Sequence, residues 1–78
     1  MSNNDIEKKV INIVEKKLNV SGIDLKSKQN DFVEWDSLSY LTIVLEIEKE
    51  FGLVINENNF NKFDSLHNII SLINNEKK

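Results

Sequence analysis

The sequence contains no cysteine and no proline, only two glycines, and no apolar run close to the ~18 residues of a membrane-spanning helix. Without cysteine, neither disulfides nor a thiolate metal site can support the fold, so 78 residues must share one small core. We expect a single domain, residues 1–78. The first residues lack the basic and apolar regions of a secretion signal, and we therefore expect a soluble, cytoplasmic, monomeric protein.

Positive charge is scarce in the middle of the chain. Residues 31–57 contain seven acidic residues and one lysine, whereas the segments on either side are slightly basic. Phosphate binding needs clustered lysine or arginine, so this charge pattern disfavours nucleic acid as a partner. A basic protein surface would complement these acids. The alternative is that the acids simply form the solvated face of a helix.

Patterns of catalysis and metal binding are missing as well. The single histidine, His67, has no cysteine and no paired acid that would make a nucleophile of a nearby serine. The chain also lacks the ligand spacing of a metal site. We therefore expect His67 on the surface, no metal, and a protein that is not an enzyme.

Apolar residues at spacings of three and four predict three main helices. The first is capped by Ser2 or Asn4 and runs to Leu18, the central one covers residues 37–51, and the last begins at Asp64–Ser65. None of these segments shows the alternation of a strand. The fold class is therefore all-α.

The connections complete this prediction. Residues 19–34 form a long loop, pinned to the core by Ile23, Leu25, Phe32 and Val33. After the stop at Gly52, residues 57–62 form a short helix that places Phe60, and Phe63 just beyond it, on the core side. Three main helices and one short helix predict a small antiparallel four-helix bundle. The residues that we expect in its core are Ile6, Val10, Ile13, Ile43, Ile47, Phe51, Ile55, Phe60, Leu66, Ile69, Ile70 and Ile73.

The central helix has more apolar surface than a core requires. Asp36 is a good N-cap for it, and Ser37 follows in the first turn. If Ile43, Ile47 and Phe51 face the core, a neighbouring strip should stay in solvent and serve as a contact surface for a partner protein. This leucine strip consists of Leu38, Leu41 and Leu45.

Three acids follow the strip and are expected to attract basic partners over a distance. They are Glu46, Glu48 and Glu50, opposed by Lys49 alone. An alternative assigns the three leucines to the core, covered by Phe32 and Val33 of the long loop. The two alternatives predict opposite exposures for the strip.

The tripeptide Asp-Ser-Leu occurs twice, at residues 36–38 and 64–66, each time where a helix is predicted to start. Such residues are common at helix N-termini, so the tripeptide alone is weak evidence of function. The helix after Ser65 is an ordinary amphipathic one, which assigns Ser65 a structural role. The helix after Ser37 is the one with surplus apolar surface.

The run Trp35-Asp36-Ser37-Leu38, the apolar and acidic helix after it, and residues 50–55, Glu-Phe-Gly-Leu-Val-Ile, together resemble the acyl carrier protein family. The resemblance extends over nearly the whole chain, since the remaining helices and the long loop occur in the family's order. It implies a covalent 4′-phosphopantetheine on Ser37, flanked by Asp36 and Leu38. The arm would come from coenzyme A through a phosphopantetheinyl transferase.

By the same resemblance, the protein would hold acyl or aminoacyl groups as thioesters and present them to loading ligases and to acyl transferases or synthases. Glu34 stands where the family commonly has glycine, and Ser39 and Thr42 stand where it often has acids. These differences leave the pathway open among fatty acid, polyketide, aminoacyl and polysaccharide-related biosynthesis. The alternative function is an unmodified helical module that binds a partner through its central helix.

Overall fold

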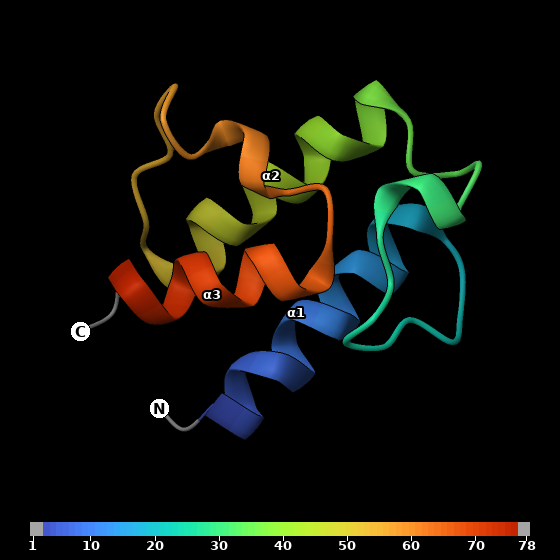
Figure 1. Cartoon of the computed structure of the whole chain (residues 1–78), viewed down its shortest axis with the longest axis horizontal. Helices are drawn as coiled ribbons and strands as arrows, with labels where there is room; N and C mark the ends of the chain where they lie inside the picture. The colour runs from blue at the N-terminus through green and yellow to red at the C-terminus, as the bar shows by residue number, and fades with distance from the viewer. Residues whose placement is uncertain (1–2, 77–78) are drawn as a thin grey trace.

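The computed structural model describes residues 3–76 and contains three α-helices and two 3₁₀ turns (Figure 1). In chain order they are α1 (Asn3–Leu18), η1 (Gln29–Asp31), α2 (Ser37–Phe51), η2 (Phe60–Lys62) and α3 (Leu66–Glu76). Over these residues the only β-type pairing is an isolated bridge between Lys28 and Ser65. The predicted all-α class is confirmed. No helix in residues 3–76 is long and apolar enough to cross a membrane.

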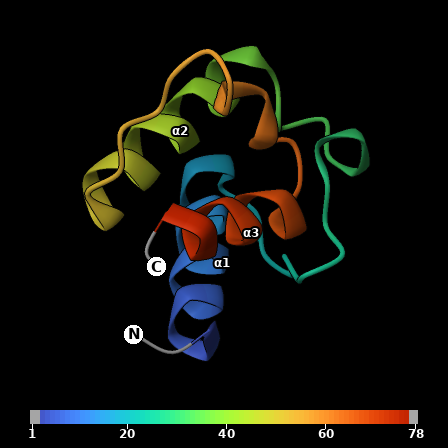
Figure 2. The same ribbon diagram turned by 60° about the vertical axis from the view of Figure 1, so that its left-hand side comes forward.

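The helix α1 packs against both α2 and α3, and both views of the ribbon show it adjoining the two (Figures 1 and 2). Its apolar residues recur every three or four positions, so they line one face and are buried there. One cluster of buried side chains joins the three helices. Its members are Ile6, Val10, Ile13, Val14, Leu18, Ile23, Trp35, Ile43, Val44, Ile47, Phe51, Phe63, Leu66, Ile69, Ile70, Leu72 and Ile73.

The helices α1 and α2 end in the same way. Asn19 and Gly52 each follow the last helical residue in the left-handed conformation, with φ of 57° and 65°. In both cases the next N–H group reaches back to a carbonyl five residues earlier, from Val20 to Glu15 and from Leu53 to Glu48. This arrangement satisfies carbonyls that a helix end would otherwise leave unpaired. The predicted stop at Gly52 is confirmed.

Tyr40 attaches the segment before α3 to α2. Its hydroxyl donates to the carbonyl of Phe60 and accepts from the N–H of Phe63 at 3.1 Å. Its ring packs on both phenylalanines, with centroid distances of 5.3 Å to Phe60 and 6.5 Å to Phe63. These contacts hold η2 beside the first turns of α2.

The long loop departs from its prediction. It contains η1, and of its four predicted anchors Ile23 is buried and Phe32 is partly buried. Leu25 and Val33 are exposed, Val33 to 95%, so the prediction that they pin the loop was wrong. The physical reason is that a loop has no fixed side-chain period, so hydrophobicity alone does not tell which residue turns inward. The loop forms a wide arc at the right of Figure 1.

The segment before α3 also differs from the prediction. In place of a short helix over residues 57–62 there is a single 3₁₀ turn, and α3 begins at Leu66. Phe60 was placed in the core but is 42% exposed, because Phe63 takes the inward position. Ile55 is only partly buried.

The prediction for the start of α1 falls partly outside the structure. The helix is described from Asn3, so Asn4 lies inside it and is not its cap. Ser2 lies outside the described residues.

Candidate functional site

Ser37 is the first residue of α2 and is exposed. Asp36 caps the helix as predicted, because its carboxylate accepts the Ser39 N–H at 2.9 Å and its carbonyl accepts the Tyr40 N–H at 2.8 Å. The hydrogen bond from Ser39 lowers the pKa of Asp36, which keeps this side chain an acceptor. The Ser37 hydroxyl itself makes no hydrogen bond to any residue from 3 to 76.

The second Asp-Ser-Leu copy has a different environment. The Ser65 hydroxyl accepts the N–H of Asn68 at 3.1 Å and so caps α3. The backbone on both sides is tied to the long loop, from Gln29 N–H to the Asp64 carbonyl and from Leu66 N–H to the Ser27 carbonyl. The structural role predicted for Ser65 agrees with these contacts. Ser37 and Ser65 occur in the same tripeptide, but only the Ser65 hydroxyl is engaged in a hydrogen bond within residues 3–76.

The leucine strip lies in solvent. Leu38, Leu41 and Leu45 are exposed to 71%, 43% and 55%, whereas Ile43 and Ile47 on the same helix are fully buried. The alternative that places these leucines in the core under Phe32 and Val33 is therefore wrong. An apolar row of this kind extends from the first turn of α2, immediately beside Ser37, toward its middle.

Each of the three acids on α2 has a partner inside the chain. Glu46 pairs with Lys17 at 3.6 Å and Glu50 with Lys9 at 3.4 Å. Glu48 accepts the backbone N–H of Ile55 at 3.1 Å. The two ion pairs could not be predicted from the sequence, because they depend on the rotation and register of α1 against α2.

Comparison with known proteins shows the family of the chain. The model of the family described as "Phosphopantetheine attachment site" matches residues 8–73. The chain is 30% identical to the acyl carrier protein of Buchnera aphidicola subsp. Schizaphis graminum (strain Sg), over 96% of this chain and 98% of that protein. It is 34% identical to the acyl carrier protein of Rickettsia bellii (strain OSU 85-389), over 94% and 93%. The chain belongs to the acyl carrier protein family.

Membership of the acyl carrier protein family implies a covalently attached 4′-phosphopantetheine. When attached, this group supplies a thiol that carries acyl cargo as a thioester. The first turn of α2 fits such a group, because Ser37 offers an exposed and unbonded hydroxyl. A phosphodiester there would lie at the positive end of a 15-residue helix.

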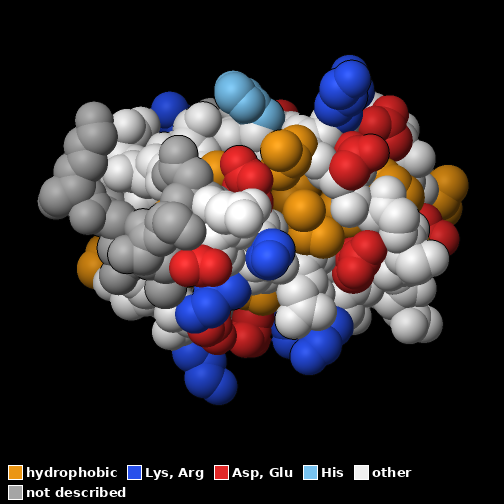
Figure 3. Space-filling view, turned by 90° about the horizontal axis from the view of Figure 1, so that it is seen from below, with side chains coloured by type: hydrophobic (Ala, Val, Ile, Leu, Met, Phe, Trp, Pro, Cys, Tyr) orange, Lys and Arg blue, Asp and Glu red, His pale blue; other side chains and the backbone are white. Residues whose placement is uncertain are grey.

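The single histidine and the acids are the candidate metal ligands of this acyl carrier protein family member. Among the described residues no group of histidine and acids could hold a metal ion. His67 is exposed on α3, as predicted, and is seen in pale blue in Figure 3. That face carries lysines and acids intermixed, without a large area of one sign.

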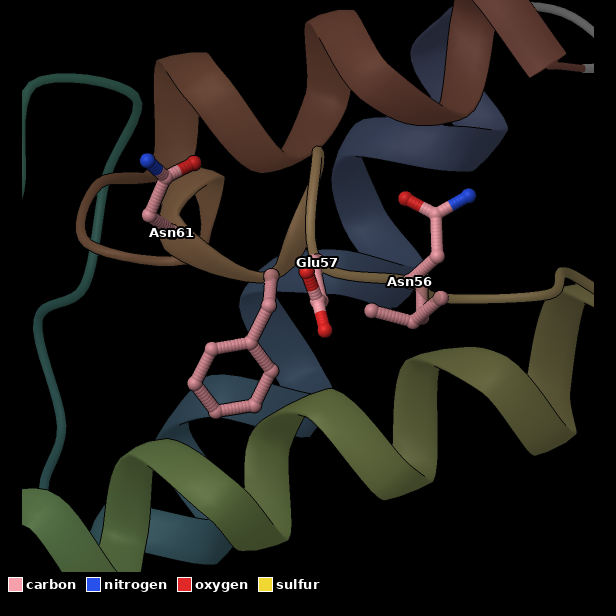
Figure 4. Close-up of a pocket in the computed structure, with 5 residues that line it drawn as sticks. Asn56, Glu57 and Asn61 are labelled. Atoms are coloured by element: carbon pink, nitrogen blue, oxygen red, sulfur yellow. The ribbon is translucent and has the colours of Figure 1, made fainter.

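A hollow of about 470 Å³ lies beside the segment that precedes α3 (Figure 4). It is lined by Ile55, Asn56, Glu57, Phe60 and Asn61. None of the predicted site residues is among them, so the hollow is separate from Ser37 and from the leucine strip.

Proposed function

We propose that Ser37 carries the 4′-phosphopantetheine arm and that the chain is a non-catalytic carrier of acyl or aminoacyl groups. The observation that supports this assignment most directly is the contrast between its two Asp-Ser-Leu copies. Ser37 is exposed and unbonded at the start of α2, while Ser65 is engaged as the cap of α3. The partners are a phosphopantetheinyl transferase, loading ligases and acyl transferases or synthases. The pathway is one of fatty acid, polyketide, aminoacyl or polysaccharide-related biosynthesis.

Arm transfer tests the assignment of Ser37. The chain is incubated with coenzyme A, Mg²⁺ and a broad-specificity phosphopantetheinyl transferase, and its intact mass is measured. The wild-type chain and Ser65→Ala should each gain one arm, and Ser37→Ala should gain none. Modification of Ser37→Ala, or no modification of the wild type by several transferases, would contradict the proposal.

We also propose that partner enzymes bind along α2, on the leucine strip beside Ser37. Three exposed leucines in a row have no structural role that would explain them, and burying them against a partner is favourable. Glu46, Glu48 and Glu50 lie on the same helix and would supply the attraction for a basic partner surface. Attraction of this kind acts mainly on the association rate.

A polar substitution in the strip tests this surface. Leu41→Ser should leave the melting temperature nearly unchanged, because the side chain is already 43% exposed, and should lower kcat/KM for arm transfer about tenfold. Val54→Ser is the matched control, since Val54 is 81% exposed and lies outside α2. Equal transfer rates for Leu41→Ser, Val54→Ser and wild type would rule out the strip as the contact surface.

A further inference from the structure

Two lysines of α1 form ion pairs with two acids of α2. Lys9 Nζ lies 3.4 Å from a carboxylate oxygen of Glu50, and Lys17 Nζ lies 3.6 Å from one of Glu46. All four side chains are between 32% and 44% exposed, so the pairs are at the surface and reachable by another protein. Between them lies a groove of α1 and α2 that is also lined by Asn12 and Ile13.

The position of the pairs relative to the leucine strip matters. Successive helix residues are about 100° apart, so Glu46 lies about 100° and Glu50 about 140° around α2 from Leu45. Both acids are on the flank that faces α1, where Lys17 and Lys9 pair with them. A partner seated on the strip therefore meets these ion pairs where its surface extends round α2 toward α1.

An ion pair has almost no field at a distance, because its two charges cancel beyond their own separation. Lys9 and Lys17 therefore reduce the negative field that Glu46 and Glu50 would otherwise present to an approaching basic protein.

We propose that Lys9 and Lys17 act as an internal brake on partner association, by occupying the acids that a basic partner enzyme would otherwise attract and bind. The inference deepens the proposed docking surface and rests on it. A basic side chain of the partner must displace Lys9 or Lys17 before it pairs with Glu50 or Glu46. Because half-exposed pairs contribute little to stability, this exchange is open to a partner that supplies an arginine.

The test compares two double variants that change the net charge equally. Lys9→Gln/Lys17→Gln frees both acids, while Lys8→Gln/Lys26→Gln removes two exposed lysines that form no ion pair with α2. Initial rates of arm transfer from coenzyme A are measured for both and for wild type at low and at high salt. Lys16 is left in place because it lines the groove.

At low salt the Lys9→Gln/Lys17→Gln variant should show kcat/KM raised roughly two- to fivefold over wild type, and the control variant clearly less. This rise in kcat/KM should vanish at about 1 M salt, where the Debye length is only about 3 Å and charges hardly interact beyond it. Adding Glu46→Gln/Glu50→Gln to the first variant should also abolish it. Melting temperatures verify that all variants are folded.

Equal rises of kcat/KM in the two double variants would show an effect of net charge alone and would overturn the proposed brake. No rise in Lys9→Gln/Lys17→Gln would overturn it too. Both results leave the proposed function standing as long as the chains still gain one arm each. Failure of every variant, wild type included, to gain an arm would instead overturn the proposed function and the brake together.

Discussion

At the scale of single residues, Tyr40 shows how one side chain can join two parts of a small fold. Its hydroxyl bonds to the backbone of Phe60 and of Phe63, and its ring lies against both. Burial raises its pKa from 10.0, the Phe63 N–H opposes that rise, and the nearby Asp64 carboxylate adds to it. The fold therefore favours the protonated phenol.

Tyr40→Phe should lower the free energy of unfolding by about 1 kcal/mol at pH 8, because the hydroxyl bonds are lost. Since the folded pKa is raised, the contribution of the phenol is fully present below about pH 10 and is lost as the pH rises through the folded value. The difference in the free energy of unfolding between wild type and Tyr40→Phe should then become smaller in the alkaline range. Urea unfolding at pH 8 and pH 11 measures it.

The chain has one tyrosine, so its ionisation can be followed directly by tyrosinate absorbance. The midpoint in the folded protein should lie above that in urea. A folded midpoint at or below 10.0 would contradict the inferred burial of the hydroxyl.

At the scale of helices and loops, one acid near the end of each long helix holds the chain that follows. The Glu15 carboxylate accepts the Ile23 N–H, and the Glu48 carboxylate accepts the Ile55 N–H, both at 3.1 Å. Their backbone carbonyls also accept the bonds that close α1 and α2. Each acid therefore fixes both the end of its helix and the direction of the next segment.

Glu48→Ala should destabilise the protein by about 1 kcal/mol, because it leaves the partly buried Ile55 N–H without its acceptor. Glu48→Gln should retain most of the stability, since an amide oxygen can accept the same hydrogen bond. Urea unfolding compares the two, with Lys49→Ala as an exposed neighbour on α2. Equal losses in Glu48→Ala and Glu48→Gln would show that charge, and not the hydrogen bond, is what matters there.

At the scale of the whole molecule, one core joins all three helices, and its large side chains carry much of the stability. Phe51 is 3% exposed and Phe63 is fully buried, whereas Phe60 lies half in solvent. A domain of this size has only about 5 to 15 kcal/mol of total stability. The loss of one buried ring is therefore a large fraction of it.

Phe51→Ala should cost about 3 to 5 kcal/mol, and Phe60→Ala should cost much less although the same atoms are removed. The single tryptophan, Trp35, is 2% exposed, so its emission should shift to longer wavelength on unfolding and report the urea transition. Similar costs for the two variants would mean that Phe60 belongs to the core after all.

Much of the fold follows from local rules that are legible in the sequence. The spacing of apolar residues predicted the three main helices, Asp36 predicted the start of α2 and Gly52 its end. These features depend on residues within a few positions of one another. The exposure of the leucine strip was one of two alternatives that the sequence left open, and the path of the long loop decided between them.

The tertiary structure decided the rest, because it depends on segments far apart in the chain. Phe63 and not Phe60 turns inward, since Tyr40 on α2 fixes the path of that segment through two backbone contacts. Val33 lies in solvent because its loop has no periodicity to direct it. The pairing of Lys9 and Lys17 with the acids of α2 is set by the register between two helices, and nothing in either helix by itself specifies that register.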